Sequence, residues 1–303
     1  MVDATEPDSI IAAYARNRKA LKVAIETLAV VKVELYFHDA YLTSATAFVY
    51  RFAKTYVMVT SLHVLNGFNS NTQKFLDSRN FVPNKIAFYL NVFSDEIEAF
   101  RVEPFSVDLL RDGQPVWFES AVASPVIDVA LIELEAVMED FDRIRDRIGY
   151  LHGGRMLVRV DEQANLQFAY HAYPRIGSDV FILGFPKGIG QGAFPIWKKG
   201  SIATEPLYGA IQSGAPVILI DAVTRDGMSG SPVLYFGSDV AGDYGAAIAD
   251  SDGPYVVGVY AGREGVTPEE NSMALGRVWK VELLDALFSE NLRCRGKYFG
   301  PPT

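Results

Sequence analysis

Cysteine is nearly absent from this 303-residue sequence, which contains only Cys294. A single thiol excludes an internal disulfide bond and any cysteine-rich zinc site. Disulfide bonds brace many secreted proteins, so their absence favours a reducing compartment. The first eight residues also lack the basic start and the apolar run of a secretory signal. The sequence therefore predicts a cytoplasmic protein.

Basic residues and long apolar runs are scarce as well. The chain has 28 Lys and Arg against 37 Asp and Glu, a net charge of -9, so we expect no nucleic-acid partner and no membrane partner. Apolar runs such as residues 215–220 are far shorter than the roughly 20 residues that cross a bilayer. Hydrophobic residues nevertheless make up 49% of the chain, which excludes global disorder.

The apolar pattern indicates many short strands and few helices. Helical patterns cover residues 9–25, 136–148 and 279–288. Elsewhere apolar residues alternate or form short runs between Gly and Pro. Strands are expected at 31–37, 45–52, 56–60, 85–93, 96–102, 115–121, 129–134, 156–160, 166–170, 179–183, 200–204, 217–221, 232–236 and 255–260. This pattern predicts an all-β protein of two barrels or sandwiches, and the length suits two domains of about 150 residues or one two-lobed enzyme.

Three short segments at the edges of expected strands carry residues suited to nucleophilic catalysis. They contain, in chain order, His63, Asp128 and Ser229. A serine hydroxyl is a poor nucleophile at neutral pH unless an imidazole takes its proton and a carboxylate holds that imidazole in the right tautomer. We therefore expect Ser229 to be the nucleophile, His63 the base and Asp128 the orienting carboxylate. The other three histidines lack such a context, and we interpret them as structural or solvated.

The glycines beside the serine suit an oxyanion hole. Gly227 stands two residues before Ser229 and allows a turn in which two backbone amides point the same way. We expect the amides of Gly227 and Ser229 to bind the oxyanion that develops on a substrate carbonyl.

Taken together, these motifs resemble the chymotrypsin-like (trypsin-like) serine peptidases, most closely their disulfide-free bacterial type. The order His, Asp, Ser is that family's order and differs from subtilisins and α/β-hydrolases. Thr-Ser-Leu-His resembles the family's Thr-Ala-Ala-His, Asp-Val-Ala-Leu matches closely, and Gly-Met-Ser-Gly-Ser-Pro resembles Gly-Asp-Ser-Gly-Gly-Pro. The resemblance covers roughly residues 31–288. It implies an all-β fold of two six-stranded antiparallel β-barrels with the site between them.

The implied fold divides the chain into five parts. They are an N-terminal helical extension (1–27), a first β-barrel (28–135), a helical linker between the barrels (136–154), a second β-barrel (155–278), and a C-terminal helix and tail (279–303). The first barrel would carry His63 and Asp128, and the second Ser229. We expect no cofactor and no metal, because the carboxylates clustered between residues 239 and 252 do not have the spacing of an EF-hand loop.

The sequence departs from the digestive enzymes at Met228, where they carry an acidic residue that pairs with a newly cut N-terminus. Met228 cannot form that ion pair, so residues 1–27 are not expected to be an activation peptide of that type.

The resemblance also places a substrate-binding pocket, with Val223 and Thr224 at its base and Tyr260, Ala261 and Gly262 along one wall. Because no acidic residue stands at the base, a neutral or apolar substrate side chain is favoured over Lys or Arg.

The sequence therefore predicts a serine endopeptidase that acts on protein or peptide substrates through an acyl-enzyme intermediate. A second hypothesis is a catalytically silent, protease-like binding scaffold, which the departures Thr-Ser-Leu-His and Met228 keep open. A third is a latent enzyme that a regulatory protein partner activates through the N-terminal helix. Covalent labelling of Ser229 by a fluorophosphonate probe separates the enzyme from the scaffold.

Overall fold

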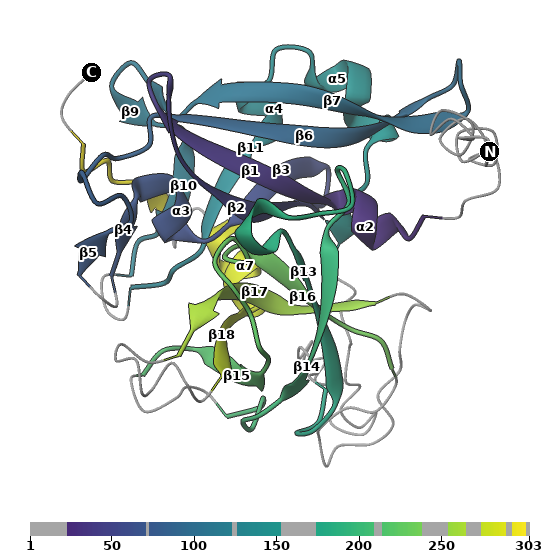
Figure 1. The fold of residues 1–303 in the computed structure, drawn as a ribbon, viewed down its shortest axis with the longest axis vertical. Helices are drawn as coiled ribbons and strands as arrows, with labels where there is room; N and C mark the ends of the chain where they lie inside the picture. The colour runs from purple at the N-terminus through teal and green to yellow at the C-terminus, as the bar shows by residue number, and fades with distance from the viewer. Residues whose placement is uncertain are drawn as a thin grey trace, which may run out of the picture.

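The computed structural model describes residues 23–70, 73–122, 126–152, 174–208, 214–237, 254–264, 274–288 and 293–300. It is a mostly β protein with two β bodies stacked on each other (Figure 1). The helix expected over 9–25 and the strands expected over 156–160 and 166–170 lie outside the described residues, apart from the helix's last residues. The short helix α2 (Ile25–Ala29) leads directly into the first strand.

The first body is a nine-stranded sheet. The path runs β19-β10-β11-β3-β2-β1-β6-β7, with β12 beside β2. The strands are β1 (Val30–Phe37), β2 (Ala40–Phe52), β3 (Thr55–Thr60), β6 (Lys85–Ser94), β7 (Ala99–Asp108), β10 (Trp117–Ser120), β11 (Ala130–Glu133), β12 (Leu151–His152) and β19 (Arg293–Arg295).

A closed first barrel is not found among the described residues. The edge of β10 pairs with β19, a three-residue strand from the end of the chain, and β7 lies at the other end of the path. Since the C-terminal strand occupies the edge that closure would need, the sheet stays open there. Two further two-stranded pairs lie beside it, β4 (Phe68–Asn69) with β5 (Lys74–Phe75) and β8 (Leu110–Arg111) with β9 (Gln114–Pro115).

The second body is a closed antiparallel barrel, which confirms one of the two expected six-stranded barrels. Its strands, in order around the barrel, are β13 (Asp179–Gly184), β14 (Ile196–Ile202), β15 (Val217–Asp221), β18 (Leu275–Lys280), β17 (Tyr255–Arg263) and β16 (Ser231–Tyr235).

The C-terminal helix begins later than the sequence pattern indicated. Trp279 belongs to β18, where it pairs with Val217 on one side and Val259 on the other. Its indole is fully buried in the barrel, and this packing outweighs the helical periodicity. The helix α7 therefore runs over Glu282–Phe288.

The helical pattern at 136–148 forms short turns rather than one helix. They are α4 (Leu134–Val137), α5 (Phe141–Ile144) and the 3-10 turn η2 (Arg145–Arg147). Phe141 and Ile144 are buried in the core of the first sheet. No described helix is long and apolar enough to span a membrane.

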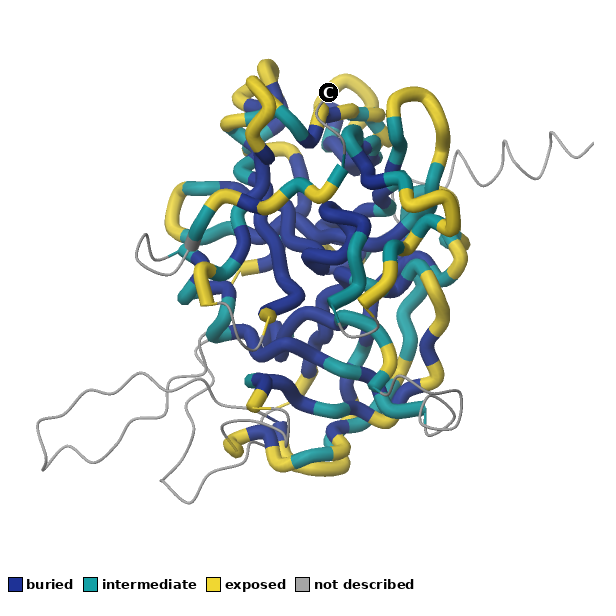
Figure 2. The backbone as a smooth tube through the Cα atoms, turned by 90° about the vertical axis from the view of Figure 1, so that its left-hand side faces the viewer, coloured by how far each residue is buried: buried dark blue, intermediate teal, exposed yellow. Residues whose placement is uncertain are grey.

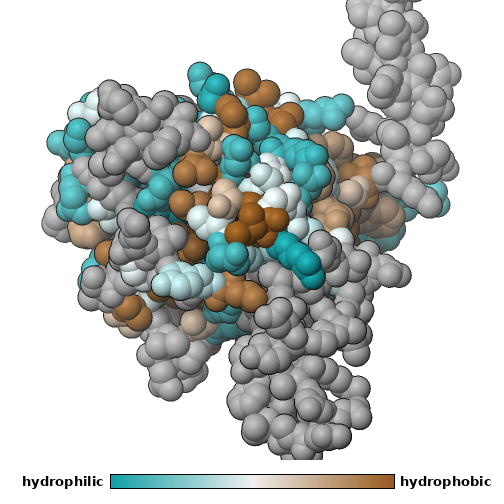
Figure 3. Space-filling model, turned by 90° about the horizontal axis from the view of Figure 1, so that it is seen from below, coloured by the Kyte–Doolittle hydropathy of each residue, from teal (hydrophilic) through white to brown (hydrophobic). Residues whose placement is uncertain are grey.

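The long strand β2 joins the two bodies. Side chains alternate between the two faces of a strand, and in β2 Ala47 and Val49 enter the core of the first sheet, whereas Phe48 and Tyr50 belong to the cluster that fills the second barrel. Figure 2 shows this continuous buried interior. On the face seen in Figure 3, apolar side chains lie in small groups among polar ones. Segments far apart in the sequence therefore meet along β2 and the neighbouring end of β3.

Candidate active site

His63 is held by a single helical turn at the end of β3. The helix α3 (Leu62–Asn66) begins two residues after the strand and ends at Gly67, whose N–H donates to the His63 carbonyl at 3.0 Å. Gly67 has a φ of 67°, and an added Cβ would lie 2.8 Å from Cδ of Pro83. Glycine is needed at this end of the helix, so the backbone of His63 has little freedom.

Asp128 reaches His63 because their strands are antiparallel neighbours. Ala130 of β11 pairs with Thr60 of β3, so the residues before β11 and after β3 lie at the same end of the sheet. Asp128 Oδ1 accepts from the backbone N–H of His63 at 2.8 Å, and Oδ2 lies 2.6 Å from His63 Nδ1. His63 is 8% exposed and Asp128 7%. A carboxylate only accepts hydrogen bonds, so Nδ1 carries the proton and Nε2 is left as an acceptor.

The loop that carries Ser229 is fastened to the same part of the first sheet. Thr46 N–H donates to the Ser229 carbonyl at 3.0 Å. Gly230 has a φ of 86°, and an added Cβ would lie 2.0 Å from the Thr46 carbonyl oxygen and 2.3 Å from Oγ1 of Thr60. The loop therefore lies against the last residue of β3, three residues before His63. Ser229 itself is half-buried.

The geometry between serine and histidine is open. The Ser229 hydroxyl makes no hydrogen bond to His63 in the structure, whereas the His63–Asp128 pair is fully formed. Catalytic hydrogen bonds are commonly long before substrate binds. The structure thus brings the three predicted residues to one end of β3, with His63 and Asp128 in contact.

The backbone amides of Gly227 and Ser229 differ from the amide between them in their hydrogen bonding. Met228 N–H, which lies between them, donates to the Arg225 carbonyl at 3.3 Å. Among the described residues, no acceptor takes up the N–H of Gly227 or of Ser229. Gly227 has a φ of 91°, a conformation that glycine adopts readily.

The predicted pocket residues separate into a buried pair, a half-buried pair and one exposed residue. Thr224 is 1% exposed and its hydroxyl hydrogen-bonds that of Tyr260, which is 2% exposed. Burial raises the pKa of Tyr260 to about 12, so its hydroxyl stays neutral. Val223, in contrast, is 52% exposed, and Ala261 and Gly262 are half-buried at the end of β17.

Sequence reasoning missed several groups that hold the site together. The Tyr260 carbonyl accepts from Gly230 N–H at 2.8 Å and from the buried Ser61 hydroxyl at 3.3 Å. After β13 the chain forms the 3-10 turn η3 (Pro186–Gly188). Lys187 N–H in that turn donates to the carbonyl of Asp226 at 2.6 Å. No sequence signal marks these contacts, because each joins segments far apart in the chain.

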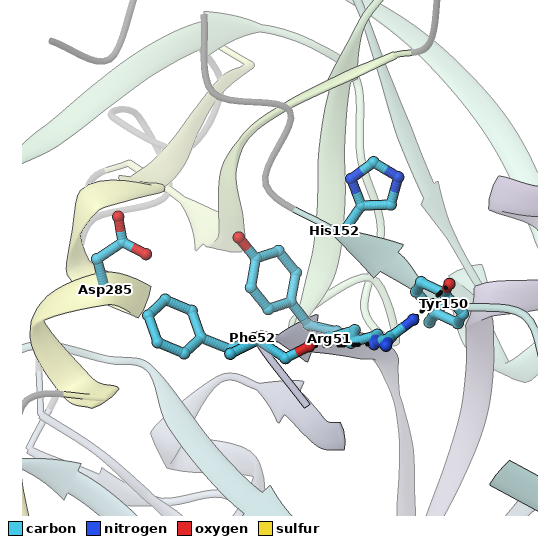
Figure 4. A pocket seen from close by; sticks show the side chains of 7 residues that line it. Arg51, Phe52, Tyr150, His152 and Asp285 are labelled. Atoms are coloured by element: carbon cyan, nitrogen blue, oxygen red, sulfur yellow. Dashed lines mark hydrogen bonds between the residues drawn. The ribbon is translucent and has the colours of Figure 1, made fainter. Parts of the chain in front are cut away.

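One described cavity lies away from this arrangement, and another is lined by Asp128 itself. A cavity of about 440 Å³ is lined by residues from the end of β2, from β12 and from α7 (Figure 4). There Arg51 donates to the hydroxyl of Tyr150 at 3.0 Å. This cavity lies at the far end of the β2–β3 hairpin, about 17 Å from the His63 end at about 3.3 Å per residue.

A second cavity, of about 240 Å³, lies behind Asp128 and is also lined by Glu119 and Cys294. Burial raises the pKa of Glu119, whose carboxylate accepts from Trp117 Nε1 at 3.3 Å and from Lys297 N–H at 3.2 Å. The described residues contain no group of three or more His, Cys, Asp or Glu side chains placed to hold a metal ion.

Comparison with known proteins gives weak similarity to bacterial proteases. No family model and no curated protein matches the chain. Among solved structures, the active form of the Rv3671c protease from M. tuberculosis is 18% identical with a TM-score of 0.46, covering 95% of this chain and 89% of that one. Its inactive form is 18% identical with a TM-score of 0.43, covering 91% and 93%. The serine endoprotease from Yersinia pestis is 13% identical with a TM-score of 0.45, covering 89% and 67%.

Proposed function

We propose that the protein is a serine endopeptidase that hydrolyses peptide bonds in protein or peptide substrates. The observation that carries this proposal is the buried His63–Asp128 pair, whose two hydrogen bonds leave Nε2 of the imidazole as an acceptor. The Ser229 loop lies against the same end of β3. A nucleophile, a base and an orienting carboxylate are the parts that acyl transfer requires.

The reaction follows from the placement of these groups. Ser229 Oγ attacks the scissile carbonyl carbon while His63 Nε2 takes the hydroxyl proton, and Asp128 stabilises the imidazolium. The amides of Gly227 and Ser229 bind the oxyanion. Collapse of the tetrahedral intermediate breaks the C–N bond, and His63 returns the proton to the leaving amine. Water then attacks the acyl-enzyme with His63 again as base, which releases the acid and frees Ser229.

We place the substrate side chain beside the Thr224–Tyr260 hydroxyl pair. Both residues are buried, and the Tyr260 carbonyl is tied to the loop of the nucleophile. Neither side chain carries a charge, because burial raises the pKa of the Tyr260 hydroxyl to about 12. These residues therefore give the site an uncharged base, which favours a neutral substrate residue, whereas a Lys or Arg would be buried there without a counter-ion.

A fluorophosphonate probe tests the proposal on the full chain. We expect labelling of Ser229, located by peptide mass spectrometry, together with hydrolysis of an unfolded protein substrate. Ser229→Ala should abolish both, since loss of a triad member lowers turnover by up to about a millionfold. Ser231→Ala is the matched control: Ser231 lies two residues further on, and its buried hydroxyl has no hydrogen-bond partner among the residues that the structure describes. Ser231→Ala should keep full labelling.

The open contact between Ser229 and His63 favours one rival, a protease-like scaffold that binds without catalysis. If the protein is such a scaffold, the wild-type chain shows no labelling and no hydrolysis under any condition. The absence of either one would contradict the proposed peptidase function. Labelling of a residue other than Ser229 contradicts the assignment of the nucleophile.

A further inference from the structure

Thr46 is fully buried on the face of β2 that meets the second barrel. It has the same side-chain direction as Phe48 and Tyr50, which pack into the barrel's core. Its hydroxyl donates to the Gly227 carbonyl at 2.7 Å and accepts from Phe185 N–H at 3.0 Å. One side chain therefore connects β2, the turn after β13 and the loop of the nucleophile.

The loop of the nucleophile is fixed through its carbonyl groups. Each of four consecutive carbonyl oxygens accepts one hydrogen bond: Asp226 O from Lys187 N (2.6 Å), Gly227 O from Thr46 Oγ1 (2.7 Å), Met228 O from Ser231 N (3.0 Å) and Ser229 O from Thr46 N (3.0 Å). In a trans peptide the C=O and the following N–H point in opposite directions. The bonds at Asp226 and Met228 therefore set where the amides of Gly227 and Ser229 point.

The Thr46 hydroxyl holds the peptide between those two amides. It binds the Gly227 carbonyl directly, so the Gly227–Met228 peptide cannot rotate without breaking that bond. Through Phe185 it also anchors the turn whose Lys187 N–H holds the Asp226 carbonyl. The two segments approach so closely that a Cβ on Gly227 would lie 2.4 Å from the Phe185 carbonyl oxygen.

We propose that Thr46 is a positioning residue whose hydroxyl orients the two oxyanion-binding amides for catalysis. This inference rests on the proposed peptidase function. Thr46 does not touch the substrate. Without the hydroxyl, the Gly227 carbonyl and the Phe185 N–H each lose a buried hydrogen-bond partner. The loop then rearranges so that these groups form other hydrogen bonds. The amides then no longer point at the developing oxyanion, whose stabilisation by one such donor is worth about 100- to 1,000-fold in kcat.

Thr46→Val removes the hydroxyl at nearly constant volume and keeps the backbone N–H that binds Ser229. We expect kcat to fall about 100-fold with little change in KM, because substrate binding in the ground state does not use the oxyanion amides. Inhibition by a peptide aldehyde, whose adduct resembles the tetrahedral intermediate, should weaken in parallel. Thr46→Ser restores the hydroxyl and should recover most of both.

Thr27→Val is the matched control for the loss of a buried threonine hydroxyl. Thr27 is buried on α2, and its hydroxyl accepts from Trp197 Nε1 at 3.0 Å, away from the loop of the nucleophile. The Thr27→Val substitution should lower the melting temperature and leave kcat unchanged. An equal fall of kcat in both variants would show a general effect of stability and overturn the inference, as would wild-type kcat in Thr46→Val.

Labelling of the wild-type chain separates this inference from the proposed function. If Ser229 of the wild type does not react with the fluorophosphonate probe, the peptidase assignment itself fails. If the wild type reacts and Thr46→Val reacts at the same rate, the peptidase stands and the role of Thr46 fails. A slower reaction of Thr46→Val, restored in Thr46→Ser, supports both.

Discussion

The carboxylate of Asp128 binds His63 at two points, the backbone N–H at 2.8 Å and the ring Nδ1 at 2.6 Å. One contact fixes the helical turn and the other fixes the ring. The two oxygens therefore have separable roles, which a single substitution can distinguish.

Asp128→Asn tests the role of the ring contact. The amide oxygen of the new side chain can still accept from the His63 backbone, but its NH₂ group then faces Nδ1. The ring must present Nδ1 as an acceptor and carry its proton on Nε2, so it cannot take the proton of Ser229. We expect kcat to fall about 10,000-fold with the fold intact, measured by steady-state hydrolysis and circular dichroism. Turnover within tenfold of the wild type would contradict the assignment of His63 as base.

The pairing of His63 and Asp128 was predicted from short motifs whose order resembles that of a known family, although the two residues lie 65 positions apart. Each residue stands at the end of a short apolar strand, and antiparallel neighbours bring such ends together. The motifs also located the loop of Ser229. These signals lie within a few residues of the chain, where periodicity and turn chemistry act.

The contacts of Thr46 could not be predicted. Its hydroxyl meets Phe185 and Gly227, which lie 139 and 181 positions away, and a threonine is ordinary in a strand. The pairing of β19 with β10 was missed for the same reason: three residues are too few for a periodic signal, and their partners lie more than 170 positions earlier. That pairing also leaves the first sheet open, where a closed barrel was expected.

Gly230→Ala should disrupt the site through a clash with backbone. Its φ is 86°, and the new Cβ would lie 2.0 Å from the Thr46 carbonyl oxygen. We expect a loss of stability on the order of 3 kcal/mol or more, as is typical of strain at a buried site, and loss of Ser229 labelling.

Gly214→Ala separates the clash from the cost of the backbone conformation. Gly214 has a φ of 76°, and no atom of the described residues lies within 4 Å of an added Cβ. The left-handed conformation alone should cost about 1–2 kcal/mol and leave labelling intact. Equal losses of stability in the two variants, measured by urea unfolding, would mean that the contact between Gly230 and β2 is not as close as the structure gives it.

Glu119→Gln tests the buried carboxylate behind Asp128. Burial raises the pKa of Glu119 in the folded state, so the folded protein binds its proton more tightly than the unfolded chain does. Stability therefore falls as pH rises from the unfolded pKa of about 4.3 through the higher folded value, and stays lower above it. The glutamine keeps an acceptor for Trp117 and does not ionise.

The advantage of Glu119→Gln over the wild type should therefore grow from pH 4 to pH 8, measured by denaturant unfolding at each pH. Asp285→Asn, a substitution of the same kind at a half-buried position of α7, is the comparison variant. A stability advantage of Glu119→Gln that shrinks with rising pH would contradict the raised pKa of the buried Glu119.

Two N-terminal truncations test whether the N-terminal segment regulates the proposed activity, as the sequence suggested. Removal of residues 1–22 leaves α2 in place. Removal of residues 1–27 also takes Thr27, whose hydroxyl accepts from Trp197 of β14, and the buried Glu26. The longer truncation should therefore melt lower than the shorter one by about 2–4 °C. If the segment binds a regulatory partner or restrains the site, turnover should change already in the shorter truncation. Turnover equal to that of the full chain would exclude this role. In that case α2 would have only a structural role.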